Sequence, residues 1–167
     1  MIFEEGSHLA IVSLLLAALV VAADQIFKLL DVQYVKPVGS ISVIPGFFNL
    51  DYVENRGAAF SMMQDRTALF VSVTAVVCVL IVAAMFRYRN HEFFSRAACV
   101  LVLGGGIGNM IDRLSHTYVV DYLHVFFFPA IFNFGDMCVT VGAVFFVIHV
   151  LFYLEKDNQA EKVMRTK

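Results

Sequence analysis

The sequence is poor in charged residues and has no tryptophan. Only 16% of its 167 residues are Asp, Glu, Lys or Arg, whereas a soluble domain carries about 25%. Hydrophobic residues make up 60% and the mean hydropathy is +0.78, against roughly 45–50% apolar residues in a typical globular chain. A chain of this composition lacks the polar residues needed to cover a globule in water. The composition therefore excludes a soluble protein and indicates a membrane protein.

The sequence also lacks the residue patterns of several kinds of site. Its three cysteines, Cys78, Cys99 and Cys138, lie in apolar runs, and an odd number in such places is typical of small buried side chains. The five histidines show no metal-ligand spacing, and neither HExxH nor GxSxG occurs. No basic stripe indicates nucleic acid. We therefore expect no metal, no cofactor and no nucleic-acid partner, and a hydrolase of this sequence has to use carboxylates.

Long apolar runs are what the sequence does have. Four of them approach the roughly 17–25 residues that cross a bilayer as a helix. Glu4 and Glu5 precede the first run without Lys or Arg, and no small-residue cleavage site follows it, so we expect a retained helix and not a signal peptide. The predicted transmembrane helices are residues 9–30, 68–86, 97–114 and 137–154.

Basic residues gather in two places that set the orientation of these helices. The loop of residues 87–96 holds three arginines, and the tail after residue 154 holds four Lys or Arg residues. Because cytoplasmic loops carry an excess of Lys and Arg, both segments are predicted to be cytoplasmic. Four spans then place both termini on the cytoplasmic side, although the first residues add no basic side chain in support.

The first outer loop, residues 40–63, has a different pattern. Short alternating or aromatic runs lie on either side of Pro45-Gly46, which predicts two strands joined by a turn. We expect an amphipathic sheet resting on the membrane surface. The predicted fold is an all-α membrane protein, a single domain over residues 1–167, with four transmembrane helices and a small extracytoplasmic β-cradle.

The polar residues near the apolar runs converge at one depth, on the outer side. Ionisable side chains are costly in a bilayer, so they are a functional hypothesis by default. The main alternative function is that of a transporter, but a transporter requires charges near the bilayer midplane and inverted repeats, and the sequence shows neither. A purely structural subunit leaves the convergence unexplained. The polar residues that converge at this depth are Asp24, Lys28, Asn55, Arg56, Asn109, Asp112, Arg113, Asp121 and Asp136.

Most of these residues also have a structural interpretation. Asp136 follows FNFG and precedes a helical run, as a helix N-cap does. Asp24 and Lys28 are four residues apart on one helix face and match an ion pair. Asp112 and Arg113 match a structural pair that closes the end of the third helix. Asp121 lies between apolar residues with no capping role, which favours a function for it. Two carboxylates in one dry site share a proton, so one can act as general base on a water and the other as acid.

Five blocks of sequence, taken in order, resemble those of one family. They are DQIFK (24–28), NRGAAF (55–60), GGGIGNMIDR (104–113), VVDYL (119–123) and FNFGD (132–136). Over nearly the whole chain the sequence resembles the bacterial lipoprotein signal peptidases, also called signal peptidase II. The resemblance implies an intramembrane aspartyl endopeptidase in the bacterial cytoplasmic (inner) membrane, with its active site toward the outer face.

The resemblance also implies a substrate and a set of site residues. The substrate is a diacylglyceryl-modified prolipoprotein, cut just before the lipidated cysteine by a monomer in contact with membrane lipid, and the antibiotic globomycin inhibits the reaction. Asp121 and Asp136 match the catalytic pair. Gly135 stands where the family usually has Ala, and Met137 where Ser is common, which leaves the pair intact. The other matched positions, which support the pair or line the substrate path, are Asp24, Lys28, Asn55, Gly57, Asn109, Asp112, Arg113 and Asn133.

Overall fold

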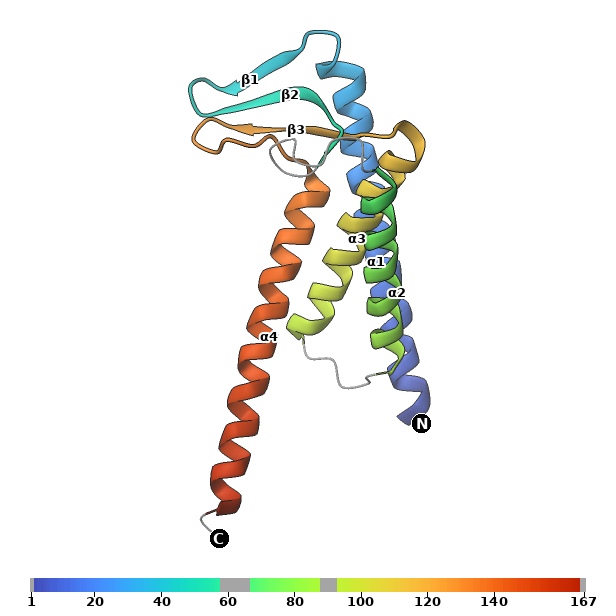
Figure 1. Ribbon diagram of the computed structural model, residues 1–167, viewed down its shortest axis with the longest axis vertical. Helices are drawn as coiled ribbons and strands as arrows, with labels where there is room; N and C mark the ends of the chain where they lie inside the picture. The colour runs from blue at the N-terminus through green and yellow to red at the C-terminus, as the bar shows by residue number, and fades with distance from the viewer. Residues whose placement is uncertain (1, 58–66, 88–92, 166–167) are drawn as a thin grey trace.

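Four long helices form the body of the protein. The computed structural model describes residues 2–57, 67–87 and 93–165. The helices within these residues are α1 (Ile2–Leu30), α2 (Thr67–Arg87), α3 (Phe93–His116) and α4 (Phe134–Arg165). All four are long and apolar enough to cross a membrane, which confirms the predicted helical membrane fold (Figure 1).

A three-stranded antiparallel sheet covers one end of the helices (Figure 1). Its strands are β1 (Ser40–Ile44), β2 (Phe48–Asn55) and β3 (Val119–Val125), in that order across the sheet. β1 and β2 form the predicted hairpin, and Gly46 adopts a φ of 71°, which glycine does without strain. Residues 58–63 of the predicted cradle lie outside the described residues. Both chain termini lie at the end opposite the sheet, as an even number of spans requires.

The sequence does not predict strand β3. Its residues are apolar on both sides of Asp121, and the residues that follow match an outer loop. In the structure the chain leaves α3 through Thr117, which has a φ of 68°, and turns back across the helix ends. β3 then pairs with β2, with Val53 opposite Asp121 and Asn55 opposite Val119. This pairing brings the end of β2 beside Asp121.

Several elements extend beyond the apolar runs of the sequence. α1 continues as one turn of π-helix, η1 (Asp31–Val35), and α4 begins at Phe134, ahead of the predicted start at Met137. Helices α2 and α3 take up both ends of the loop predicted over residues 87–96, and residues 88–92 lie outside the described residues. Helix ends are set by caps and local hydrogen bonds, which hydropathy does not report.

Helix α3 lies at the centre and packs against α1, α2 and α4. Two glycines make this close approach possible. A Cβ at Gly105 would overlap the carbonyl oxygen of Gly135 in α4, and one at Gly108 would overlap the carboxylate of Asp24 in α1. Large apolar side chains on the outside, such as Val79, are exposed, as in helices that face lipid. The tight packing around α3 brings the polar residues of three helices together.

Candidate active site

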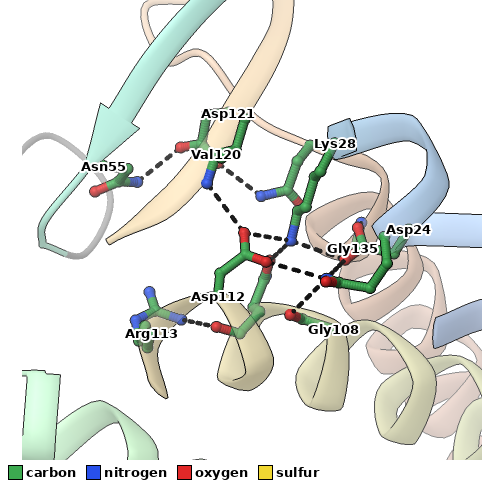
Figure 2. A network of polar contacts seen from close by, with 12 residues as sticks. Asp24, Lys28, Asn55, Gly108, Asp112, Arg113, Val120, Asp121 and Gly135 are labelled. Carbon is green, nitrogen blue, oxygen red and sulfur yellow. Dashed lines mark hydrogen bonds and ion pairs between the residues drawn. The ribbon is translucent and has the colours of Figure 1, made fainter. Parts of the chain in front are cut away.

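A buried set of polar side chains, here called the inner polar cluster, joins α1 to α3 below the sheet (Figure 2). It consists of Asp24, Lys28, Asn109 and Asp112. The Lys28 Nζ lies 2.8 Å from Asp24 Oδ2 and 3.1 Å from Asp112 Oδ2, and it donates a hydrogen bond of 2.8 Å to Asn109 Oδ1. Residues three or four apart share a helix face, so one face of each helix supplies the cluster. The predicted Asp24–Lys28 pair is therefore one part of a larger network.

The N-terminus of α4 is held by its own cap and by α1. Asn133 is the N-cap: its Oδ1 accepts a 2.9 Å hydrogen bond from the Asp136 N–H, and the Asn133 N–H donates to Asp136 Oδ2 at 3.2 Å. These two bonds make a capping box. Asp24 Oδ1 accepts the Gly135 N–H at 2.8 Å. The interpretation of Asp136 as the N-cap is wrong, since it is the third helical residue and Asn133 holds the cap position.

Asp121 projects from β3 into the same region and is 2% exposed. Asn55 Nδ2 donates to its Oδ2 at 2.8 Å, and Asn133 Nδ2 donates to its Oδ1 at 2.6 Å. Burial, and then the nearby charge of Asp136, raise the pKa of Asp121 to about 7, against the lowering effect of the two amide hydrogen bonds. Asn133 thus contacts both aspartates, through its side chain and its backbone.

Asp136 has a second link, which leads to the inner polar cluster. Asn109 Nδ2 donates to Asp136 Oδ1 at 2.8 Å. Because Asn109 Oδ1 accepts from Lys28, the amide group of Asn109 has only one orientation that satisfies both partners. A continuous path of hydrogen bonds therefore runs from Lys28 through Asn109 to Asp136.

Two other residues implied by the resemblance lie at the margins of the site. The Gly57 N–H donates to Asn55 Oδ1 at 3.0 Å, which turns the Asn55 amide nitrogen toward Asp121. Arg113 donates to the Asn109 carbonyl at 3.4 Å, and its guanidinium carbon lies 5.0 Å from the centre of an aromatic ring on α2. The acid that precedes it, Asp112, pairs with Lys28 from α1, so the expected closing pair at the end of α3 is replaced by a contact between helices.

Sequence reasoning missed two uncharged residues of the network. Gln25 Nε2 donates to Gly108 O at 3.1 Å and to Asp112 Oδ1 at 3.0 Å. The Tyr122 hydroxyl accepts the Phe134 N–H at 3.3 Å, so the first residue of α4 also has a partner. Gln25 lies beside a charged residue in an apolar run, which is the one signal that points to it in the sequence. Tyr122 carries no such signal, because its role depends on the unpredicted strand.

The arrangement suits acid–base chemistry on a water molecule. Two carboxylates of unlike surroundings lie on either side of one asparagine, and separate donors fix each of them. Within the part of the chain that the structure describes, no group of three or more His, Cys, Asp or Glu side chains has the geometry to hold a metal ion.

Comparison with known proteins identifies the family. The family described as signal peptidase (SPase) II matches residues 16–152. Lipoprotein signal peptidases of Caldanaerobacter subterraneus subsp. tengcongensis and Moorella thermoacetica are 42% and 43% identical over 132 residues, covering 79% and 78% of this chain and 90% and 87% of theirs. Two solved structures of bacterial membrane enzymes superpose with TM-scores of 0.76 and 0.75 at 29% and 30% identity, over 84% of this chain and 87% and 92% of theirs. The chain therefore belongs to the signal peptidase II family of membrane peptidases.

Proposed function

We propose that this peptidase is an aspartyl endopeptidase that removes the signal peptide from diacylglyceryl-modified prolipoproteins. It cuts just before the lipidated cysteine. Membership of the family supports the prolipoprotein substrate. The observation that carries the aspartyl mechanism is the pair Asp121 and Asp136, joined by Asn133 in a buried site.

The two aspartates have different parts in this mechanism. Asp136 is the general base, since it lies in the first turn of α4, where the helix dipole stabilises an anion, and it accepts two hydrogen bonds. Asp121 is the general acid, because burial and the nearby charge of Asp136 raise its pKa to about 7, which keeps a proton on it in mildly acid solution. Cleavage is therefore expected to slow as the pH rises through about 7 and Asp121 loses its proton.

The proton transfers balance over one turnover. Asp136 takes a proton from water as the water oxygen attacks the scissile carbonyl carbon, and Asp121 gives its proton to the carbonyl oxygen. When the tetrahedral intermediate collapses, the C–N bond breaks, Asp136 gives its proton to the departing cysteine nitrogen, and Asp121 recovers a proton from the hydroxyl. The products are the signal peptide with a new carboxylate and the lipoprotein with a free amino terminus.

The remaining site residues hold this pair in place. Lys28 and Asn109 orient Asp136, and Asp24 and Asp112 hold the Lys28 ammonium. Asp24 also accepts the Gly135 N–H and so holds the start of α4. On the other side, Asn55 fixes Asp121. Gly57 in turn fixes the amide of Asn55, and Arg113 donates to the carbonyl of Asn109, the residue that orients Asp136. The residues of this group are Asp24, Lys28, Asn55, Gly57, Asn109, Asp112, Arg113 and Asn133.

The proposed function also implies a placement of the protein in the membrane. We place the protein in the bacterial cytoplasmic membrane as a monomeric single domain, with both termini cytoplasmic and the site toward the outer face. In support, Asp121 belongs to β3 and Asp136 to the first turn of α4, and both elements meet at the end of the helices opposite the two termini (Figure 1). A substrate held in the outer leaflet by its acyl chains reaches a site at this depth without leaving the membrane.

The test is cleavage in detergent of a lipidated prolipoprotein and of the same precursor without lipid. Asp121→Asn and Asp136→Asn are each expected to lower the rate by about 100-fold or more, since each removes an acid–base group. Asp51→Asn, on β2 and hydrogen-bonded to Ser40 and His124, is the matched control and is expected to keep activity. Globomycin is expected to block the reaction.

Two results would contradict the proposal. Residual activity above about a tenth of wild type in either variant would remove that aspartate from the pair, because such a loss is below the usual acid–base contribution. Equal rates on lipidated and bare precursor would contradict the lipoprotein specificity.

A further inference from the structure

Gln25 contacts three groups of the inner polar cluster and its surroundings, although it carries no charge. Its Nε2 lies 3.0 Å from Asp112 Oδ1, 3.1 Å from Gly108 O and 3.3 Å from Asp24 Oδ2. A side-chain amide nitrogen has two hydrogens, so these three acceptors take up its whole donor capacity. Gln25 thus ties α1 to α3 beside Lys28.

The acceptors of Asp112 explain why this amide matters. Asp112 Oδ2 accepts from Lys28 and from the Val120 N–H at 3.1 Å, while Oδ1 accepts from Gln25. No other donor to Oδ1 is found among the described residues. Lys28 has three N–H groups, and they are fully used by Asp24, Asp112 and Asn109, so Lys28 has no further donor for the second oxygen of Asp112.

The neutral acceptor that competes for Lys28 is Asn109 Oδ1, at 2.8 Å. Of the three interactions that Lys28 makes, the hydrogen bond to Asn109 is the weakest, because carboxylates attract a cation more strongly than an amide oxygen does. If Asp112 Oδ1 loses its donor, Lys28 is drawn toward the carboxylates and away from Asn109. The amide of Asn109 is then free to rotate, and Asp136 loses the hydrogen bond that Asn109 gives it.

We propose that Gln25 is a positioning residue for Asp136, acting through Lys28 and Asn109. The inference rests on the proposed function, in which Asp136 is the general base. A base that loses a hydrogen-bond donor holds its proton more tightly, so a higher pH is needed to ionise it. Removal of the Gln25 amide therefore lowers kcat, moves the acid limb of the pH–rate profile to higher pH and leaves KM nearly unchanged.

The test compares Gln25→Leu with Ser13→Ala on purified full-length protein. Ser13 is a buried polar residue of α1 whose hydroxyl donates within the helix, to Leu9 O at 2.8 Å, so it controls for a polar change in α1. Gln25→Leu is expected to lower kcat by about tenfold to a hundredfold, the range that a small misplacement of a catalytic group costs. Ser13→Ala is expected to keep kcat and the pH profile of the wild type.

A double-mutant cycle separates positioning from simple bracing of the two helices. If Gln25 acts through Asn109, Gln25→Leu changes kcat little in an Asn109→Ala background, whereas a brace alone costs the same factor in both backgrounds. Equal factors would overturn the inference. A Gln25→Leu variant with the kcat and the acid limb of the wild type would also overturn the inference. That result would leave the proposed function intact, because the proposed function is tested separately, by Asp121→Asn and Asp136→Asn.

A measurement without substrate tests the same contact directly. The side-chain amide signals of Asn109 in a ¹⁵N NMR spectrum report its hydrogen bonds to Lys28 and Asp136. Gln25→Leu is expected to shift or broaden these signals, and Ser13→Ala is expected to leave them in place. Unchanged Asn109 signals in Gln25→Leu would overturn the inference whatever the activity of the protein.

Discussion

Two polar networks in this protein are built from similar side chains but lie in different surroundings. The inner polar cluster has side chains exposed by only 4% (Lys28), 0% (Asp24) and 5% (Asp112). A second set, the outer polar network, lies along β2 and beside the ends of η1 and β3. It consists of Lys36, Tyr52, Glu54, Arg56 and Tyr118. In this network Lys36, Glu54 and Arg56 are 45%, 33% and 56% exposed.

Exposure decides how much each network contributes to stability and to position. Lys36 Nζ lies 3.7 Å from Glu54 Oε1, and Arg56 Nη2 lies 3.3 Å from Glu54 Oε2, and both pairs are open to water that screens them. A pair in the inner polar cluster has no such screening, and breaking it leaves a charge buried without a partner. The outer polar network is therefore free to rearrange, while the inner one holds its geometry.

The largest expected effect is that of Lys28→Met. This change leaves two carboxylates buried without their cation, which costs about 3–5 kcal/mol in the free energy of unfolding. It also removes the donor that orients Asn109, so cleavage is expected to be lost. Thermal unfolding and cleavage assays in detergent measure the two effects, with Lys36→Met as the matched control. Similar losses in both variants would show that burial does not distinguish the networks.

The sequence predicts the inner polar cluster well because charged residues in apolar runs stand out. Asp24, Lys28 and Asp112 are visible for that reason. Gln25 is not predicted from the sequence, since an uncharged amide in a helix has many uses. Strand β3 is not predicted either, because a short apolar run fits a helix end as well as a strand. Which oxygen of each carboxylate meets which donor depends on the packing of α3 against two helices, and no local pattern contains that information.

A smaller change in the free energy of unfolding, opposite in sign to that of Lys28→Met, is expected for a substitution at Asp31. This residue is 3% exposed, and both of its carboxylate oxygens are without a hydrogen-bond partner among the described residues. It lies at the start of η1, on the face of α1 that carries the inner polar cluster. Removing an unpaired buried charge is expected to stabilise the protein, by about 1 kcal/mol or more for Asp31→Asn.

Asp112→Asn is the matched control for Asp31→Asn. Its carboxylate has donors on both oxygens, so the same chemical change is expected to destabilise the protein. Thermal unfolding in detergent at pH 8 compares the two variants. A loss of stability in Asp31→Asn would mean that this carboxylate has a partner that stabilises it.

The smallest effect is expected in the outer polar network. Glu54→Gln removes a charge shared by Lys36 and Arg56, and because exposed pairs contribute little, the free energy of unfolding is expected to fall by less than about 1 kcal/mol. The difference is expected to shrink further in high salt, and cleavage is expected to be unchanged. A large loss of cleavage in Glu54→Gln would contradict the view that the outer polar network can rearrange freely.

The central claim is that unlike surroundings leave the proton on Asp121 and the charge on Asp136. Infrared difference spectroscopy of protein labelled with ¹³C-aspartate detects the carbonyl band of a protonated carboxyl group directly, as a function of pH. The account predicts that one component of this band disappears with a midpoint near pH 7, that this component is absent in Asp121→Asn and that it persists in Asp136→Asn. A component with this midpoint that persists in Asp121→Asn and is absent in Asp136→Asn would contradict the assignment and reverse the two roles.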